Sequence, residues 1–167
     1  AVPATMNTPA NLLRACDKNP ATLPATIPPF EELLAHNRDA NIVWQHVGWD
    51  NIGYMTPVLV QALLEKHSNL YIALRVEARP FVVGGSDPMS NRLVDSNGQL
   101  KAEWLAVITA FPDRFMIGGD EFVGIPGLTP DKPASFAETW AILNQLPPDL
   151  AAKVGGENAA RIYRLHE

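Results

Sequence analysis

Three times along the chain, an apolar stretch with strand character is followed by a stretch whose apolar residues recur at helical spacing. The apolar stretches cover 41–47, 70–75 and 115–119, and the helical patterns that follow them cover 56–67, 99–111 and 135–146. Such alternation requires parallel strands joined by crossover helices, because tight hairpins connect only antiparallel neighbours. The sequence therefore predicts an α/β fold with a parallel sheet.

Outside this repeat the pattern is less regular. The first 29 residues indicate loop with one short helix that stops at Asn19-Pro20, and 30–37 has the pattern of a further short helix. A last pair of helices, 149–154 and 157–165, is expected to close the chain. We therefore divide the chain into an irregular N-terminal segment, 1–29, and a C-terminal β/α part, 30–167.

The charge pattern excludes two classes of partner. The chain carries 13 Lys and Arg against 18 Asp and Glu, and its basic residues are scattered singly, so nucleic acid is not an expected partner. The longest uncharged stretch, 51–64, contains Gly53 and Pro57 and is too short to span a bilayer, so no membrane helix is expected. A single cysteine, Cys16, does not distinguish the redox compartment. We expect a soluble protein of the cytoplasm or the periplasm.

A polar residue follows or ends each of the three predicted strands. These residues are His46, Arg75 and Asp120. Because the carboxyl ends of parallel strands lie at one edge of a sheet, the three side chains are expected to open onto one face. Trp49, in the loop after the first strand, is expected to contact a substrate on the same face. This edge is the predicted functional site.

The connection between the second strand and the next helix, 76–97, is far longer than such loops require. It is a candidate lid, with Gly84-Gly85 for mobility, and the alternative is a solvated excursion without a role. Its polar groups are Arg79, Asp87, Arg92 and Asp95.

The candidate residues also have structural interpretations. His46 could be a buried histidine bonded to a carbonyl group. Arg75 could bind a substrate carboxylate in a bidentate fork, or pair with Glu77 or Asp120.

The other aromatic and histidine residues have the pattern of structural residues. The tryptophans expected to pack in the core are Trp44, Trp104 and Trp140, and the histidines expected on helix surfaces or at the terminus are His36, His67 and His166.

Three segments resemble the amidohydrolase-related family, the metal-dependent TIM-barrel hydrolases and decarboxylases. They are "NIVWQHVGWDN", "FPDRFMIGGDEF" and "LPPDLAAKVGGENAARIYRL", and their order and spacing fit the family. The resemblance covers about Phe30 to Leu165. It implies that His46 ends the sixth barrel strand and polarises the substrate or transfers a proton. It also implies that Asp120 ends the eighth strand, binds a divalent metal, normally zinc, and orients the attacking water that cleaves a small-molecule substrate.

The chain departs from the family at several points. It has Gly118-Gly119-Asp120 where the family usually has Gly-Ser-Asp, and the other metal-ligating histidines of the family do not occur in it. A complete barrel needs about 250 residues, so the chain is expected to form the last three strands. With Asp120 alone of the expected ligands, it should hold zinc weakly.

Two alternatives remain open. The chain could be a non-catalytic half-barrel whose open edges are paired in a homo-oligomer or by a partner that supplies the missing N-terminal strands. Residues 118–122 also spell GGDEF, the signature of diguanylate cyclases, whose carboxylates hold Mg²⁺ against GTP. The cyclase context is missing, since Ile117 and an apolar strand precede the string and no Asp-x-Asp occurs earlier.

Overall fold

The computed structural model describes residues 5–7, 22–24, 27–48, 56–76, 91–118 and 137–165. A parallel three-stranded sheet lies at its centre, with the strand order β3-β4-β5. The strands are β3 (Ile42–Val47), β4 (Leu70–Leu74) and β5 (Phe115–Ile117). All three predicted strands and their parallel pairing are confirmed.

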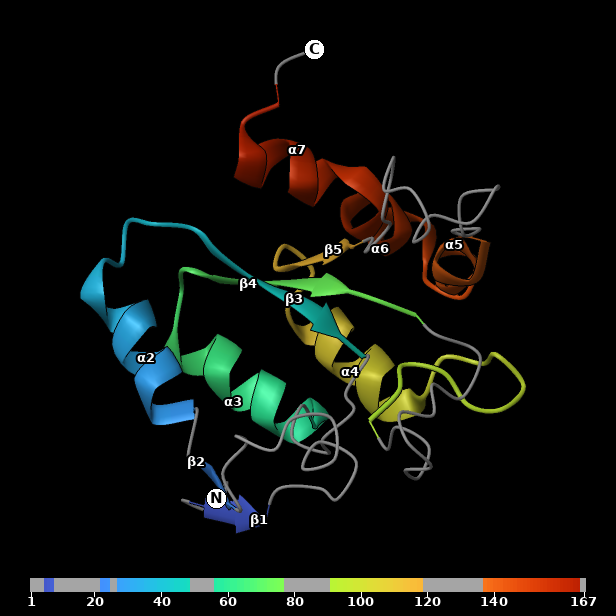
Figure 1. Ribbon diagram of the computed structural model, residues 1–167. Helices are drawn as coiled ribbons and strands as arrows, with labels where there is room; N and C mark the ends of the chain where they lie inside the picture. The colour runs from blue at the N-terminus through green and yellow to red at the C-terminus, as the bar shows by residue number, and fades with distance from the viewer. Residues whose placement is uncertain are drawn as a thin grey trace, which may run out of the picture.

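Three helices cover one face of this sheet (Figure 1). They are α2 (Ile27–His36), α3 (Pro57–Lys66) and α4 (Ala102–Ala110). Alternate residues of β4 (Leu70, Ile72 and Leu74) face them and join the larger hydrophobic core, together with the fully buried Trp104 of α4.

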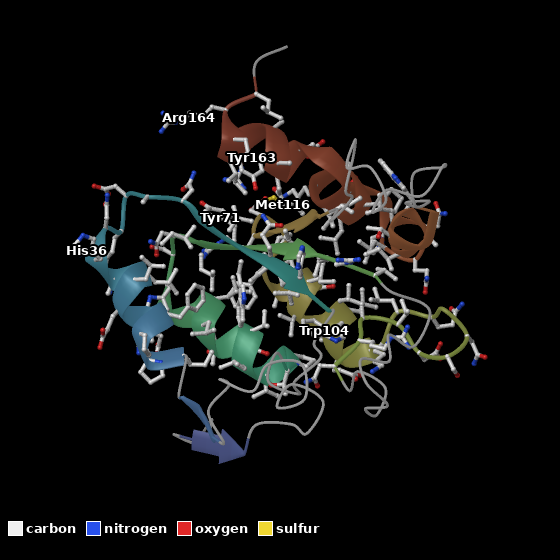
Figure 2. The ribbon with its side chains drawn as sticks, in the orientation of Figure 1. His36, Tyr71, Trp104, Met116, Tyr163 and Arg164 are labelled. Carbon is white, nitrogen blue, oxygen red and sulfur yellow. The ribbon has the colours of Figure 1, made fainter. Side chains whose placement is uncertain are left out.

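The opposite face of the sheet is covered by α7 (Asn158–Tyr163). Ala73 of β4, Met116 of β5 and Ile162 of α7 form a second, smaller core. Figure 2 shows Tyr71 and Met116 on the side of α7 and Trp104 on the other side. Because both faces are covered, β4 is apolar at nearly every position, as is typical of parallel sheets. The α/β class is confirmed, and the described residues form an open three-stranded sheet.

Side chains satisfy the polar groups at two helix ends. Thr56 Oγ1 accepts a hydrogen bond from Leu59 N at 3.1 Å, and Pro57 occupies the first turn of α3, as the sequence predicts. Asn69 is buried and donates from Nδ2 to the carbonyl oxygens of Leu34, Asn37 and Ala40, which follow or end α2. These bonds hold α2 beside the start of β4.

The C-terminal helices differ from the predicted pair. After α5 (Ala137–Leu143), the chain runs without a break through α6 (Pro148–Ala152), a π-helical turn η1 (Lys153–Glu157) and α7. The predicted gap between two helices is therefore wrong. The π-helical turn accommodates Gly155-Gly156 within the helix. Gly155 packs closely against α5, because a Cβ atom on it would lie only 3.2 Å from a methyl group of Leu143.

The N-terminal part also differs in detail. Two short strands, β1 (Thr5–Asn7) and β2 (Thr22–Pro24), pair antiparallel where irregular chain was expected. The predicted short helix falls within 8–21, outside the described residues. Helix α2 begins at Ile27 rather than at Phe30, because proline is tolerated in the first turn of a helix.

Two aromatic side chains do not lie where the sequence predicted. His67, expected on a helix surface, is only 1% exposed, because it is the C-cap of α3 and bonds to Glu31 of α2. Trp140, expected in the core, is 54% exposed, because Thr139 and Ile142 occupy the buried face of α5.

The helix predicted over 99–111 begins later than expected. Leu100 pairs with Val94 in an isolated bridge, so α4 starts only at Ala102. No helix among the described residues is long and apolar enough to cross a membrane.

Candidate functional site

The carboxyl edge of the sheet begins with a β-bulge in β3. Trp44 pairs with Ile72 and Val47 pairs with Leu74, so two residues of β3, Gln45 and His46, lie opposite one residue of β4. The extra residue returns Val47 to the same core that Trp44 contacts, where Val47 is fully buried. Bulges of this kind are common beside active sites, since they change the direction of one side chain.

His46 adopts a backbone conformation that non-glycine residues rarely adopt. Its φ is 64°, in the left-handed region, and its side chain is half-buried. Histidine is one of the residues enriched there, yet the conformation still has an energetic cost that the surrounding sheet must offset. The bulge and the positive φ therefore coincide at His46, the residue predicted to be catalytic.

Arg75 and Gly118 lie at the same edge as His46. Arg75 follows β4 directly, and its backbone N donates to Val47 O at 3.0 Å. Gly118 follows β5, and its N donates to Leu74 O at 2.8 Å. The three strand ends are thus joined laterally by backbone hydrogen bonds, which place the backbones of His46 and Arg75 at one edge of the sheet. That their side chains open onto one face stays a prediction.

Gly48 allows this edge to be closely packed. Its φ is +92°, and a Cβ atom there would lie 2.3 Å from Leu93 Cγ and 3.1 Å from Arg75 O. Leu93 is fully buried and thus covers the sheet edge beside β3 and β4. Only glycine fits at position 48, which explains the glycine two residues after His46.

The part of the predicted lid that the structure describes, residues 91–97, ends in a turn held by hydrogen bonds to Asp95. Asp95 accepts hydrogen bonds from the backbone N of Asn97 and of Gln99 at 2.8 and 2.9 Å. Leu93 and Val94 before it are buried, so residues 91–100 belong to the packed body of the protein. Asp95 has a structural part in the turn. The rest of the predicted lid, 77–90 with Arg79 and Asp87, lies outside the described residues.

Several predicted site residues also lie outside the described residues. Trp49 follows Gly48 directly, and Asp120 and Glu121 come two and three residues after Gly118. The predicted pocket shared by His46 and Asp120, and the GGDEF alternative, therefore stay predictions. Among the described residues, no three His, Cys, Asp or Glu side chains lie close enough together to hold a metal ion. Those residues therefore do not fit a metal site by themselves.

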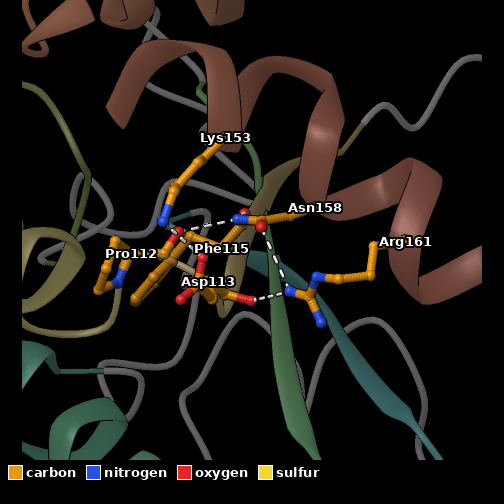
Figure 3. Close-up of polar contacts among 6 residues, drawn as sticks. All are labelled: Pro112, Asp113, Phe115, Lys153, Asn158 and Arg161. Atoms are coloured by element: carbon orange, nitrogen blue, oxygen red, sulfur yellow. Dashed lines mark hydrogen bonds and ion pairs between the residues drawn. The ribbon is translucent and has the colours of Figure 1, made fainter. Parts of the chain in front are cut away.

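The opposite, amino edge of the sheet carries a polar network that sequence reasoning missed (Figure 3). Asn158 is buried and donates from Nδ2 to Pro112 O and to Phe115 O, each at 2.8 Å. Arg161 donates to Asp113 O at 2.6 Å, and Lys153 Nζ lies 2.8 Å from Asp113 Oδ1. The hydrogen bond from Lys153 lowers the pKa of Asp113. This network fixes the C-terminal helical run to the turn before β5.

Arg114 and Tyr71 extend the network across the sheet. Arg114 donates from Nε to Leu70 O at 2.7 Å and from Nη2 to His67 O at 2.5 Å. Its guanidinium carbon lies 5.0 Å from the ring centroid of Tyr71, and that of Arg161 lies 5.9 Å from the same ring. Partial burial lowers the pKa of Arg114 from its usual value, and the group stays protonated at neutral pH.

A third polar cluster joins α2 to α3. Glu31 Oε1 lies 2.6 Å from Lys66 Nζ and 3.1 Å from Nε2 of the buried His67. Hydrogen bonds from Lys66, and then from His67, hold the pKa of Glu31 below its ordinary value. These contacts connect two helices on one side of the sheet, so they have a structural explanation.

Comparison with protein-family models, with curated proteins and with solved structures gave no match to the chain.

Proposed function

We propose that the carboxyl edge of the sheet is the active site of a metal-dependent hydrolase or decarboxylase similar to the amidohydrolase-related family. One observation carries the proposal. His46 occupies the extra position of a β-bulge, in a left-handed conformation, at the edge where parallel α/β folds place functional residues. A left-handed conformation costs a non-glycine residue about 1–3 kcal/mol, so a histidine there indicates a role for its imidazole ring.

His46 and Arg75 supply complementary chemistry in this proposal. The imidazole transfers a proton or stabilises the negative charge that develops on the substrate. The Arg75 guanidinium binds a carboxylate of a small-molecule substrate through two parallel N–H donors. Their strand ends are joined by the hydrogen bond from Arg75 N to Val47 O, so both residues lie at one edge of the sheet.

The proposal includes a divalent metal, zinc by resemblance, with Asp120 as one ligand. A bound metal would supply an activated water molecule. The described residues do not provide the remaining ligands, and we derive no step through the metal. The proposal also includes a barrel of the TIM type, which the consecutive parallel order β3-β4-β5 supports and which further strands would have to close.

The role of His46 is tested with His46→Asn. Asparagine tolerates a left-handed φ, so this variant should keep the bulge and the stability while it loses the imidazole. Turnover of a panel of amides, esters and carboxylic acids with added Zn²⁺, followed by mass spectrometry, should fall by a factor of about 10² to 10⁴. Release of CO₂ distinguishes decarboxylation from hydrolysis. Equal turnover by the wild type and His46→Asn would contradict the assignment.

The role of Arg75 is tested by titration with benzoate, and with benzamide as an uncharged analogue. Benzoate should bind and benzamide should not, and Arg75→Met should abolish the difference because it removes the charged fork. Arg38→Met, at an exposed arginine in the turn before β3, is the matched control. Equal binding of both probes, or unchanged benzoate binding by Arg75→Met, would exclude a carboxylate site at this arginine.

The metal assignment is tested with a pair of neighbouring variants. Asp120→Asn should abolish metal-dependent turnover, whereas Glu121→Gln should have little effect. The resemblance implies that Asp120 ends the eighth barrel strand, and successive side chains of a strand point to opposite sides. A thermal shift by GTP with Mg²⁺, absent with Mg²⁺ alone, would instead favour the cyclase alternative.

A further inference from the structure

The two outer edges of the sheet differ in whether other parts of the chain bond to their backbone groups. Ile72 N of β4 donates to Arg114 O, and Gly118 N donates to Leu74 O of β4. Because alternate residues of a strand bond to the same neighbour, Phe115 directs its backbone groups away from β4. Its carbonyl oxygen accepts a hydrogen bond from Nδ2 of the buried Asn158 at 2.8 Å. The edge at β5 is therefore covered by the C-terminal helical run, as Figure 3 shows.

No described residue covers the edge at β3 in this way. Ile42 N donates to Asn69 O at 2.9 Å, which directs the backbone groups of Ile42 and Trp44 towards β4. The N–H and C=O groups of Val43 and Gln45 consequently point away from the sheet. In the part of the chain that the structure describes, no hydrogen bond reaches these four groups.

The sequence of β3 lacks most of the features that normally prevent edge pairing, and the one it has is the β-bulge near its end. Residues 41–47 contain no lysine, arginine, aspartate, glutamate or proline, and the bulge lies only at the end, at Gln45 and His46. Natural edge strands usually carry such features because an exposed, uncharged edge pairs with other strands. The β3 edge is thus suited to pairing.

Exposed apolar side chains lie on the elements that flank this edge. Below it, Phe30 of α2 packs on Trp44 with 5.1 Å between ring centroids, and Leu33 on the same helix is 55% exposed. Above it, Asn41 donates to Ile162 O of α7, and Leu165 just beyond α7 is 64% exposed. The elements next to β3 on both sides of the sheet therefore each carry an exposed apolar side chain.

We propose that β3 pairs antiparallel with β3 of a second copy of this chain. A two-fold axis near Trp44 places Val43 opposite Gln45 of the partner subunit, so their outward groups form four hydrogen bonds across the axis. Because the strand carries no Asp, Glu, Lys or Arg, no repulsion between like charges opposes this self-pairing. The two sheets then form one continuous sheet. This association does not need the proposed reaction, but it occupies the outer edge of β3, so a dimer held together there excludes a barrel closed at that edge.

The test measures the oligomeric state of the full chain by sedimentation velocity over a range of concentrations. The wild type should form a dimer. Val43→Pro removes only an N–H group that points outward, which an edge strand tolerates, and should raise the dissociation constant about ten- to hundredfold through two lost hydrogen bonds per dimer. Val43→Thr keeps the N–H group and the branched shape, and should dimerise like the wild type. Circular dichroism confirms that the variants fold.

Amide hydrogen exchange gives a second measurement that needs no variant. The amides of Val43 and Gln45 should be protected at high protein concentration and exchange freely at low concentration. A wild-type monomer at every concentration would overturn the proposal, and so would a dimer in which these amides stay unprotected. A folded Val43→Pro variant that dimerises like the wild type would place the contact elsewhere. A monomer that takes up a strand from another protein at β3 would also overturn self-pairing.

Discussion

Replacing Asn158 should destabilise the fold although the residue is far from the carboxyl edge. Its Nδ2 group donates to the carbonyl oxygens of Pro112 and Phe115, each at 2.8 Å, and its side chain is buried. Asn158→Ala removes both donors. The oxygen of Phe115 then stays buried without a partner, whereas that of Pro112 is only partly buried and can regain water.

The expected loss follows from these two environments. A buried carbonyl left without a partner costs about 1–3 kcal/mol, and the partly buried one costs less because water replaces the bond. The free energy of unfolding should therefore fall by about 2–4 kcal/mol, a large part of the 5–15 kcal/mol typical of a domain. For a chain of this size the midpoint of thermal unfolding should fall by roughly 5–15 °C.

Urea denaturation followed by circular dichroism measures this loss. Asn158→Asp is the informative second variant: a carboxylate accepts but does not donate, so it faces two carbonyl oxygens and should destabilise at least as much as alanine at neutral pH. Asn144→Ala, at an exposed asparagine in the turn after α5, should change stability by less than about 0.5 kcal/mol. If Asn158→Ala unfolds within that same margin of the wild type, the network does not hold the helical run to the sheet.

Two further changes test the packing of the edge and the ion pair on the helices. Gly48→Ala should lower the free energy of unfolding by more than about 1–3 kcal/mol, because its Cβ atom would lie 2.3 Å from Leu93 Cγ. Gly98→Ala, also at a positive φ but with open space around it, should lower it less. Equal losses in urea denaturation would contradict this packing. The pKa of Glu31 lies below its ordinary value of 4.5 mainly because of Lys66, so the stabilisation is present above that pH and lost as the pH falls through the folded-state value. Glu31→Gln should therefore be less stable than the wild type near neutral pH and nearly equal to it at a pH below the folded-state pKa of Glu31. A stability difference that does not depend on pH would refute the ion-pair explanation.

The sequence alone determined the elements whose causes are local. A continuous apolar run from Leu70 to Leu74 is typical of a strand buried on both faces, and Thr56 followed by Pro57 is a typical helix start. The position of His46 and Arg75 at one edge followed from the parallel order of the strands. Local residue chemistry was sufficient for the strand and the helix start, and the alternation of strands and helices along the chain was sufficient for the shared edge.

Tertiary structure decided the features that depend on partners far along the chain. The bulge at His46 exists because β3 must align Trp44 and Val47 with β4, a requirement that appears only when the two strands pair. His67 is buried because Glu31, on another helix, bonds to it, and Asn158 contacts carbonyl groups more than forty residues earlier in the chain. Such contacts form between side chains and backbone groups that folding brings together, and the periodicity of a single segment carries no information about them.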